Sequence, residues 1–270
     1  MTVSRLLEGK VAIVTGGGSG IGRAAALDFA RHGAKVGFLD RTPDDAEKVR
    51  DEIQSEGGEA IVTATDVSDA AAVEAGIRSV YERFGRIDVV FANAGINGVW
   101  TTIEDLDVDD WDETLGINLR GTFLTVKYSI PHLKKNGGSI IITSSINGNR
   151  IFNNTGASAY SSSKAGQVAF MKMAALELAP HKIRVNAVCP GAINTHIDDS
   201  TIKTKEAEEA AIPVEYPEAP ILSPGSRARL PRSRISSLIW HPICPPTLRA
   251  PIYTWMERSR CCKPKKRMAP

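Results

Sequence analysis

Tyr160 and Lys164 lie four residues apart in the segment AYSSSKAGQVAFMKMAALELA, which has helical periodicity. A spacing of four places both side chains on one face of a helix. An ammonium near a phenol favours the phenolate and lowers the tyrosine pKa from about 10 towards neutral pH, so that the phenol can act as a general acid or base. Because surface Tyr and Lys residues one turn apart are common by chance, this interpretation needs support from the rest of the chain.

A glycine-rich turn, TGGGSGIG at residues 15–22, follows an apolar run and directly precedes a helical pattern. Glycine permits a tight turn and lets the backbone approach a pyrophosphate, which then lies against the unpaired N–H groups of the helix start. A lone glycine cluster would be an ordinary loop, but its place between strand and helix predicts a dinucleotide site. We expect contacts from Gly16, Ser19, Gly20, Ile21 and Gly22.

Asp40 ends the second predicted strand, about 20 residues beyond the turn, where a carboxylate can accept hydrogen bonds from the adenosine ribose hydroxyls. It would also repel a 2′-phosphate, and the glycine turn contains no basic residue to offset that repulsion. The sequence therefore favours NAD(H) as the cofactor. NADP(H) stays the alternative, because the guanidinium of Arg41 could bind the additional phosphate.

The elements that must position these residues alternate along the chain up to about residue 195. Apolar, β-branched runs predict six strands, at residues 10–15, 35–40, 59–65, 87–92, 139–143 and 182–188. Helix-length segments lie between them, at residues 20–32, 44–56, 69–84, 108–133 and 159–179. This alternation predicts a single α/β domain, a doubly wound, Rossmann-like parallel sheet with helices on both faces.

From about Gly9 to Thr195 the chain resembles the short-chain dehydrogenase/reductase family. The resemblance rests on separate motifs in family-like order and spacing: TGGGSGIG, DV at 66, NAG at 93, INLRG around 118, the serine pair at 144–145, YSSSK at 160 and PGAINT at 190. It implies an NAD(P)(H)-dependent oxidoreductase that interconverts a ketone or aldehyde and an alcohol by hydride transfer, with Tyr160 as proton donor and acceptor.

The same resemblance implies roles for the polar residues around Tyr160. Lys164 would lower the pKa of Tyr160 and bind the nicotinamide ribose hydroxyls, and Asn118 would hold a water that links Lys164 to a proton relay. Ser145 would hydrogen-bond the substrate oxygen and stabilise its developing charge. It is favoured over Ser144, interpreted as a strand-end hydroxyl, because the Ile-Asn-Gly that follows matches the family pattern.

Further cofactor contacts are implied by the remaining motifs. The DV motif would contact the adenine, the NAG turn would pack its backbone along the cofactor, and the PGAINT segment would turn past the nicotinamide and bond its carboxamide or the pyrophosphate. For the asparagine of NAG, a structural role at the strand end is a substantial alternative, because Asn favours turns and bonds nearby backbone. A simple loop bend is the alternative for the last motif. These residues are Asp66, Val67, Asn93, Ala94, Gly95, Pro190, Gly191, Ile193 and Thr195.

Composition limits the partners. The net charge of +2, from 33 basic and 31 acidic side chains, favours neither nucleic acid nor an anionic membrane, and we expect a small carbonyl or alcohol substrate. The sequence contains no apolar run near the roughly 20 residues that span a bilayer. Four unevenly spaced cysteines fit a reducing compartment, so we expect a cytoplasmic protein. The histidines show no metal-like spacing, and we expect no metal.

The substrate pocket should be walled by residues 96–100, residues 146–152 and the segment after Gly191. Trp100, Ile151 and Phe152 predict an apolar face, whereas Arg150 could select an anionic group. Competing interpretations are a nucleotide-binding protein without turnover, a product inactivated by its altered C-terminus, and a sugar-nucleotide epimerase. The last is disfavoured because too little chain remains after residue 195 for a substrate domain.

The end of the chain departs from the family pattern. We predict a dinucleotide-binding and catalytic domain over residues 1–218 and an irregular tail, rich in Pro and Arg, over residues 219–270, in which the family's last strand is missing. Back-translation of residues 240–250 and 254–262, with codons chosen for the test, gives the family-like ASDLSAHITGT and VDGAESLL when read at one common offset. We therefore hypothesise a shift of reading frame around residues 217–226. Such a tail would remove surface through which this family commonly forms homo-oligomers.

Overall fold

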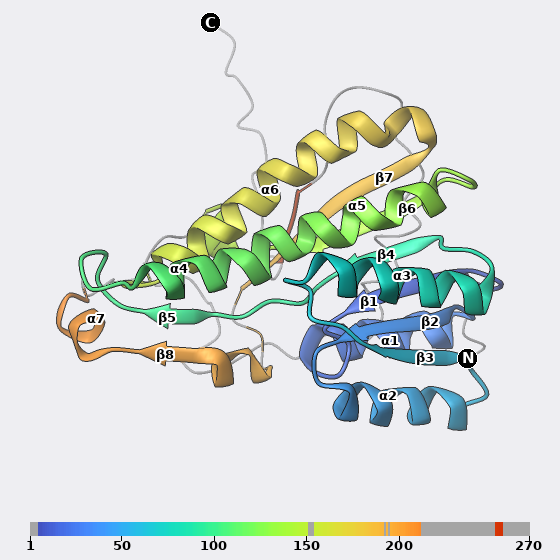
Figure 1. Cartoon of the computed structure of the whole chain (residues 1–270), viewed down its shortest axis with the longest axis horizontal. Helices are drawn as coiled ribbons and strands as arrows, with labels where there is room; N and C mark the ends of the chain where they lie inside the picture. Colours follow the sequence, from blue (N-terminus) through green and yellow to red (C-terminus); the bar gives the residue numbers. More distant parts are fainter. Residues whose placement is uncertain (1–4, 151–153, 192, 194, 212–251, 256–270) are drawn as a thin grey trace, which may run out of the picture.

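A parallel sheet of seven strands, in the order β3-β2-β1-β4-β6-β7-β9, forms the centre of the computed structural model (Figure 1). The structure describes residues 5–150, 154–191, 193, 195–211 and 252–255, the last as backbone. The predicted doubly wound α/β fold is confirmed. The strands are β1 (Val11–Thr15), β2 (Lys35–Asp40), β3 (Ala60–Ala64), β4 (Val89–Ala92), β6 (Gly138–Thr143), β7 (Ile183–Pro190) and β9 (Ile252–Trp255).

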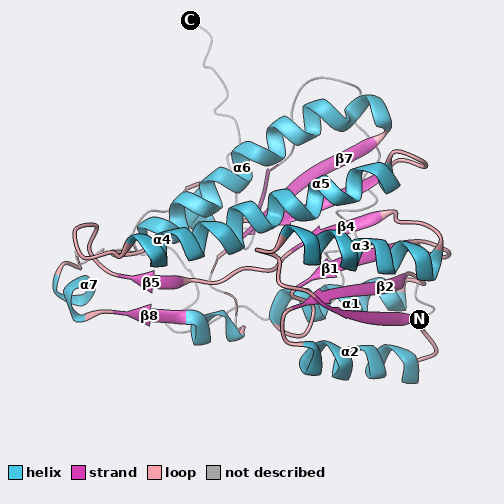
Figure 2. Cartoon of the chain, viewed as in Figure 1, coloured by secondary structure: helices cyan, strands magenta, loops and turns pink. Residues whose placement is uncertain are grey.

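Helices connect the strands and cover the sheet, as Figure 2 shows. The α-helices are α1 (Gly20–Arg31), α2 (Pro43–Ser55), α3 (Ala70–Phe84), α4 (Val108–Leu115), α5 (Gly121–Leu133), α6 (Ser158–Leu178) and α7 (Lys205–Glu209). Short 3-10 turns are η2 (Ile146–Gly148), η3 (Ala179–His181) and η4 (His196–Ser200). Local chemistry sets the ends: Asp69 accepts hydrogen bonds from two N–H groups in the first turn of α3, and Gly85 ends that helix with a φ of 76°.

The predicted helix at residues 108–133 is continuous but not uniform. Between α4 and α5 the chain makes a wider π turn, η1 (Gly116–Arg120), in which the N–H of Gly121 donates to the carbonyl oxygen of Gly116. Single π turns inside α-helices are frequent at functional sites. This one contains Asn118.

Two apolar cores lie on opposite faces of the sheet, because alternate residues of a strand point to opposite sides. In β1, Val11 and Ile13 belong to the core under α3, α5 and α6, while Ala12 and Val14 belong to the core under α1 and α2. Figure 1 shows these two groups of helices on the two faces.

The direction of winding reverses at β1, which pairs with β2 on one side and with β4 on the other. In sheets of this type, ligands bind in the crevice outside the carboxyl ends of the strands at the point of reversal. The fold therefore places a binding crevice at the ends of β1 and β4, where the glycine turn and the NAG motif begin.

A small second sheet was not predicted. It pairs β5 (Gly98–Trp100) in parallel with β8 (Thr201–Lys203), and it lies beyond the end of the main sheet, beside α4 and α7 (Figure 1). Asn97 holds the two together, since its N–H donates to Ser200 Oγ at 3.0 Å and its Nδ2 donates to Thr201 Oγ1 at 2.7 Å. The segment after β7 is thereby fixed over the crevice.

A short strand lies within the tail that was expected to be irregular. Residues 252–255 form β9, which pairs in parallel with the end of β7, with Pro190 opposite Trp255. A four-residue run is too short to show strand periodicity, but Ile, Tyr, Thr and Trp all favour strands. The predicted boundary at residues 218–219 and the rest of the tail lie outside the described residues. Within the described part of the chain, no helix is both long and apolar enough to cross a membrane.

Candidate active site

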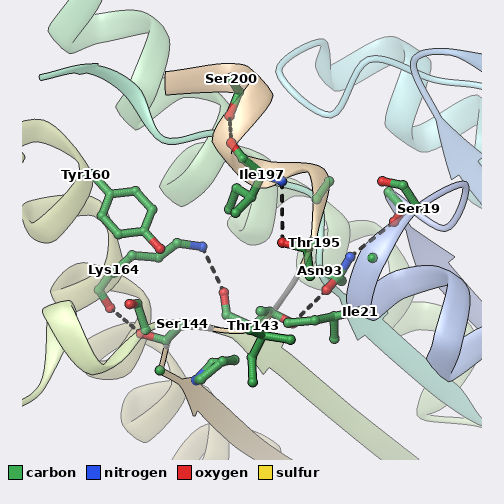
Figure 3. A pocket seen from close by; sticks show the side chains of 18 residues that line it. Ser19, Ile21, Asn93, Thr143, Ser144, Tyr160, Lys164, Thr195, Ile197 and Ser200 are labelled. Atoms are coloured by element: carbon green, nitrogen blue, oxygen red, sulfur yellow. Dashed lines mark hydrogen bonds between the residues drawn. The ribbon is translucent and has the colours of Figure 1, made fainter. Parts of the chain in front are cut away.

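A cavity of about 250 Å³ opens at the carboxyl ends of β1, β4 and β6 (Figure 3). Most of the residues predicted to bind cofactor or to act in catalysis line it. Its walls are formed by Gly16, Ser19, Gly20, Ile21, Asn93, Ala94, Gly95, Thr143, Ser144, Ser145, Tyr160, Lys164, Pro190, Gly191, Ile193, Thr195, Ile197 and Ser200. Predicted site residues that do not line this cavity are Gly22, Asp40, Asp66, Val67 and Asn118.

The glycine turn depends on close backbone contacts. Gly16 has a φ of 63°, which other residues rarely adopt. A Cβ added to Gly22 would lie 2.0 Å from the carbonyl oxygen of Gly16, and one added to Gly20 would lie 3.1 Å from the Thr195 side chain. The turn therefore forms a cradle beside the start of α1 that side chains would fill, and its shape fits a pyrophosphate.

Asp40 lies at the end of β2 beside this turn. Its Oδ2 accepts a hydrogen bond from the N–H of Gly18 at 3.0 Å, and its Oδ1 accepts one from the N–H of Thr42 at 3.1 Å. These two bonds fix the carboxylate beside the glycine turn, and its predicted bond to a ribose stays a prediction. Arg41 is exposed, and its charge acts on Asp66, where it helps to lower the carboxyl pKa.

Asp66 and Val67 lie in the loop after β3. Asp66 Oδ1 accepts hydrogen bonds from the side chain and the backbone N–H of Ser68, at 2.7 and 2.8 Å, and these bonds hold the pKa of Asp66 below its usual value. Val67 is buried and packs against Gly121, which has no room for a Cβ there. Both residues lie at the edge of the sheet, and their predicted contact with the adenine stays a prediction.

Asn93 uses its side chain within the protein. Its Nδ2 donates to the carbonyl oxygens of Thr15 and Gly16, at 3.2 and 3.1 Å, and its Oδ1 accepts from Thr143 Oγ1 at 3.0 Å. Its backbone N–H donates to Thr15 Oγ1 at 2.9 Å. These bonds tie together the ends of β1, β4 and β6, which favours the structural alternative for this residue.

Tyr160 is 8 % exposed, and its phenol points into the cavity beside Lys164 (Figure 3). The pKa of Tyr160 is raised above its usual value of 10.0, because burial of the phenol outweighs a hydrogen bond with Ser145, which lowers it. The expected downward shift caused by Lys164 is therefore not the net effect in this structure. The physical reason is desolvation, which penalises a buried phenolate.

Lys164 lies one turn further along α6, and its ammonium is 5.6 Å from the centre of the Tyr160 ring. It is 2 % exposed, and Nζ donates to the carbonyl oxygen of Thr143 at 2.9 Å. Burial lowers the pKa of Lys164 from 10.5 to about 8. A lysine with this pKa can give up and regain a proton near neutral pH.

The two neighbouring serines differ in what they contact. Ser144 Oγ donates to the carbonyl oxygen of Lys164 at 2.7 Å and so ties β6 to α6. Ser145 Oγ accepts from the N–H of Asn147 at 3.2 Å and also bonds Tyr160 from within the cavity. Ser144 thus makes a structural bond between β6 and α6, whereas Ser145 lies beside the phenol of Tyr160.

The Asn118 side chain makes three hydrogen bonds within the protein, and its expected role as a water ligand stays a prediction. Its Oδ1 accepts from the N–H of Ile96 at 2.8 Å, while its Nδ2 donates to the carbonyl oxygen of Ile96 at 2.9 Å and to Ser163 Oγ at 3.1 Å. Both amide hydrogens are therefore used inside the protein. Asn118 clamps the chain after the NAG turn against the π turn and α6.

Of the expected substrate walls, the segment after Gly191 lines the cavity, whereas residues 96–100 and 146–150 are not among its lining residues. The Trp100 ring lies 6.4 Å from the Tyr160 ring, centre to centre, and its Nε1 donates to the carbonyl oxygen of Asn97 at 3.2 Å. Arg150 is exposed. Ile151 and Phe152 lie outside the described residues. Among the residues that the structure describes, no group of three or more His, Cys, Asp and Glu side chains could hold a metal ion.

Four lining residues, Thr143, Ser144, Ile197 and Ser200, were not named as site residues from the sequence, although the last two lie in the segment after Gly191 that was expected to wall the pocket. Thr143 ends β6, holds Asn93 and accepts a hydrogen bond from Lys164. Its place at the carboxyl end of a predicted strand was a usable signal. Ile197 and Ser200 come from η4 and carried no motif, because the small sheet that positions them is a tertiary feature.

Comparisons with known proteins agree with this geometry. The family model described as short chain dehydrogenase matches residues 10–206. Levodione reductase of Leifsonia aquatica is 37 % identical over 202 residues, which cover 74 % of this chain and 75 % of that protein. A 3-ketoacyl-ACP reductase structure from Sinorhizobium meliloti has a TM-score of 0.77 and 50 % identity, covering 85 % of this chain and 89 % of that one. A Brucella melitensis 3-ketoacyl-(acyl-carrier-protein) reductase complexed with NADH has a TM-score of 0.68 and 37 % identity, covering 72 % and 80 %.

Proposed function

This chain belongs to the short-chain dehydrogenase family and interconverts a carbonyl and an alcohol group with a nicotinamide cofactor, and we propose that Tyr160 is the residue that exchanges the proton. The observation that carries this proposal is that Tyr160, Ser145 and Lys164 line the same cavity as the glycine turn. A proton donor and a dinucleotide cradle meet there at the carboxyl edge of the sheet.

The cradle residues fit the cofactor, because the closely packed turn at Gly16 and Gly22 leaves its backbone open to a pyrophosphate. The nicotinamide, when bound, supplies or accepts the hydride. Asp40 would hold the adenosine ribose, and Thr195 and the PG turn of residues 190–191 would border the nicotinamide end. The anchored carboxylate of Asp40 favours NAD over NADP by charge repulsion. The NADH complex of the Brucella melitensis relative supports this preference.

The proton steps follow from the polar groups of this chain. In reduction, Tyr160 donates its phenolic proton to the substrate oxygen while the Ser145 hydroxyl hydrogen-bonds the same oxygen and stabilises its developing charge. Burial raises the pKa of Tyr160, which keeps the phenol protonated and ready to donate. Lys164, with a pKa of about 8, then returns a proton to Tyr160. In oxidation the same transfers run in reverse.

The substrate is a small molecule with an apolar face next to its carbonyl. Trp100 supports this, because its ring lies beside the Tyr160 ring and its Nε1 is already bonded to Asn97. An indole with its N–H satisfied offers a flat apolar wall. Cyclic or aryl ketones are therefore expected to give a higher kcat/KM than charged keto acids, whereas the reverse order would assign the exposed Arg150 as the selecting group.

The decisive measurement is the oxidation of NADH with a panel of such carbonyl compounds. Tyr160→Phe should lower kcat by about 1,000-fold, because general acid catalysis by one positioned group contributes 10²–10⁴-fold. Binding of NADH, followed by its fluorescence, should be unchanged. Tyr128→Phe on α5 is the matched control and should keep wild-type activity.

The same experiment separates the competing classes. Binding of NADH without any turnover that depends on Tyr160 would identify a nucleotide-binding protein without catalysis, or a product inactivated by its C-terminus. Turnover of a nucleotide sugar with no net oxidation of the cofactor would identify an epimerase.

The protein is expected to form a homo-oligomer. This expectation is supported by an exposed apolar patch at Phe123 on α5 and Met173 and Leu176 on α6, which are 43, 55 and 54 % exposed. A mass by light scattering above that of one chain, reduced in Leu176→Lys, is expected. A monomeric mass for the unmodified protein contradicts the assignment.

A cytoplasmic location is supported by Cys189, which is buried and free of any disulfide. Fractionation of the source cells should recover the protein with cytoplasmic markers. Its recovery with secreted or membrane-bound markers overturns the assignment.

The tail after residue 218 is best explained by a shift of reading frame. The family match ends at residue 206, ahead of the tail. The transcript and peptides from the protein distinguish the alternatives: tail peptides supported by an open reading frame refute the shift, and peptides in the offset frame support it.

A further inference from the structure

Gln167 is buried on the catalytic face of α6, yet the proton steps above do not use it. It follows Lys164 by three residues and Tyr160 by seven, which places all three on one face of the helix. The side chain of Gln167 has an exposed fraction of 0 %. Amides are rarely buried this deeply without a defined set of hydrogen bonds.

The amide of Gln167 bonds the π turn. Its Nε2 donates to the carbonyl oxygen of Asn118 at 2.8 Å and to Thr122 Oγ1 at 2.7 Å, and Thr122 Oγ1 in turn donates to the same Asn118 carbonyl at 2.8 Å. These bonds form a closed triangle that uses both amide hydrogens. An amide turned the other way would point an acceptor at the Asn118 carbonyl, so the network fixes its orientation.

The other end of the amide has no partner. Gln167 Oε1 is buried without a hydrogen bond, which is an unfavourable arrangement for a polar atom. An apolar side chain of similar size would avoid this cost while filling the same space. Filling space therefore does not explain why an amide occupies this position, whereas its two donated hydrogen bonds do.

These bonds bear on the catalytic residues through Asn118. The Asn118 side chain clamps the backbone of Ile96, and the adjoining Gly95 lies between Asn118 and the active lysine. A Cβ on Gly95 would be 2.8 Å from Asn118 Oδ1 and 3.3 Å from Lys164 Nζ. Movement of the π turn would therefore move the wall against which the Lys164 ammonium is packed.

We propose that Gln167 is a positioning residue, which holds the π turn at Asn118 and thereby keeps the wall beside Lys164, and so Lys164 itself, in place next to Tyr160. This role rests on the proposed function of Tyr160 and Lys164. Gln167 acts through Asn118 and touches neither substrate nor cofactor.

The main test is Gln167→Met, which keeps the side-chain length and removes both donated bonds. We expect kcat to fall about tenfold, as for the loss of a hydrogen bond of about 1.4 kcal/mol. The KM for NADH should stay unchanged, because the glycine turn is not touched. Ser129→Ala is the control, since Ser129 is equally buried on α5 and its hydroxyl donates to the carbonyl oxygen of Thr125. A loss of kcat equal to that of the control, with an unchanged pH profile, overturns the proposal.

A second readout does not require turnover. The ionisation of Tyr160 is measured from phenolate absorbance, as the difference between each protein and its Tyr160→Phe counterpart. Gln167→Met should lower the pH of this ionisation by about 0.5 unit, because loosening of the wall beside Lys164 lets water reach the phenol, and burial of the phenol is what raises its pKa. An identical titration in the two proteins contradicts the proposal. Failure of Tyr160→Phe to reduce turnover would instead contradict the proposed function.

Gln167→Glu keeps the proposal testable if the Met variant does not fold. A neutral carboxyl group can still donate one hydrogen bond to the Asn118 carbonyl, whereas a carboxylate cannot. The kcat of this variant relative to wild type should therefore improve as the pH falls. A ratio that does not vary with pH rules out the positioning bond.

Discussion

On one side of the crevice the glycine turn of residues 15–22 is shaped by backbone atoms in close contact, whereas on the other side α6 presents buried polar side chains. A Cβ at Gly22 has no room beside the Gly16 carbonyl. Lys164 and Tyr160, by contrast, fit their places but are kept from water, so that their pKa values shift. Lack of space for a side chain therefore determines which residues the glycine turn can contain. On the α6 side, the cost of removing charged and polar groups from water determines the properties of the residues.

This difference predicts how the two sides respond to substitution. On the turn side, binding and stability should be lost together, because the same contacts serve both. On the α6 side, activity and stability should change in opposite directions, because a buried charge destabilises the fold that holds it.

Lys164→Met should give the largest loss of activity, and it should separate activity from stability most clearly. Because burial lowers the pKa from 10.5 to about 8, the folded protein binds fewer protons than the unfolded chain between these pH values. Lys164 therefore costs stability below pH 8, by up to about 3 kcal/mol, and this cost disappears as the pH rises towards 10.5. The Met variant should lose about 1,000-fold in kcat while its Tm at pH 7 rises above wild type, despite the lost bond to Thr143. The comparison of Tm at pH 7 and pH 10 is the check, and a gain that does not shrink at pH 10 contradicts the explanation.

The serine pair tests the α6 side with a matched control in the chain itself. Ser145→Ala should lower kcat by about 100-fold, in the range found when one donor to a developing oxyanion is removed. It should also move alcohol oxidation to higher pH, because the bond with Ser145 lowers the Tyr160 pKa. Ser144→Ala should change kcat by less than about threefold and cost about 1 kcal/mol of stability, since its bond to the Lys164 carbonyl is structural. Equal losses of kcat in the two variants would refute this division.

How far the sequence predicts each side follows from the same contrast. The glycine turn, Asp40 and the strands that carry them could be located from local patterns, because glycine spacing and apolar runs are themselves the cause of the structure. The predicted strand at residues 35–40 and β2 coincide for this reason. Tyr160 and Lys164 could be paired by their spacing, since one helix holds both.

What the sequence could not supply depends on burial and on contacts between distant segments. The direction of the Tyr160 pKa shift could not be predicted without knowing how deeply the phenol is buried. The Asn118 side chain forms hydrogen bonds with Ile96, 22 residues away, and with Ser163, 45 residues away. The pairing of residues 98–100 with residues 201–203 spans even more of the chain, and neither segment is long enough to show periodicity.

Gly22→Ala tests the turn side. The added methyl group would collide with the Gly16 carbonyl, and forced overpacking of this kind costs 1–3 kcal/mol. We expect NADH to bind about 30-fold more weakly, which corresponds to about 2 kcal/mol, together with a lower Tm. Gly57→Ala is a suitable control, because a Cβ there meets no atom, although its φ of 84° makes the substitution strained. Weaker binding of NADH without a loss of Tm would break the proposed link between binding and stability on this side.

Asp40→Ala should have the smallest effect, and it tests charge rather than space. Removal of the carboxylate ends its repulsion of a 2′-phosphate, so the preference in kcat/KM for NADH over NADPH should fall about tenfold, or about 1.4 kcal/mol. The N–H groups of Gly18 and Thr42 lose their acceptor, so binding of NADH should also weaken. Asp44→Ala, in the first turn of α2, is the control for the loss of one negative charge. An unchanged ratio of kcat/KM for NADH to that for NADPH would mean that the charge of Arg41 already offsets the charge of Asp40. Other residues of the crevice would then select NAD.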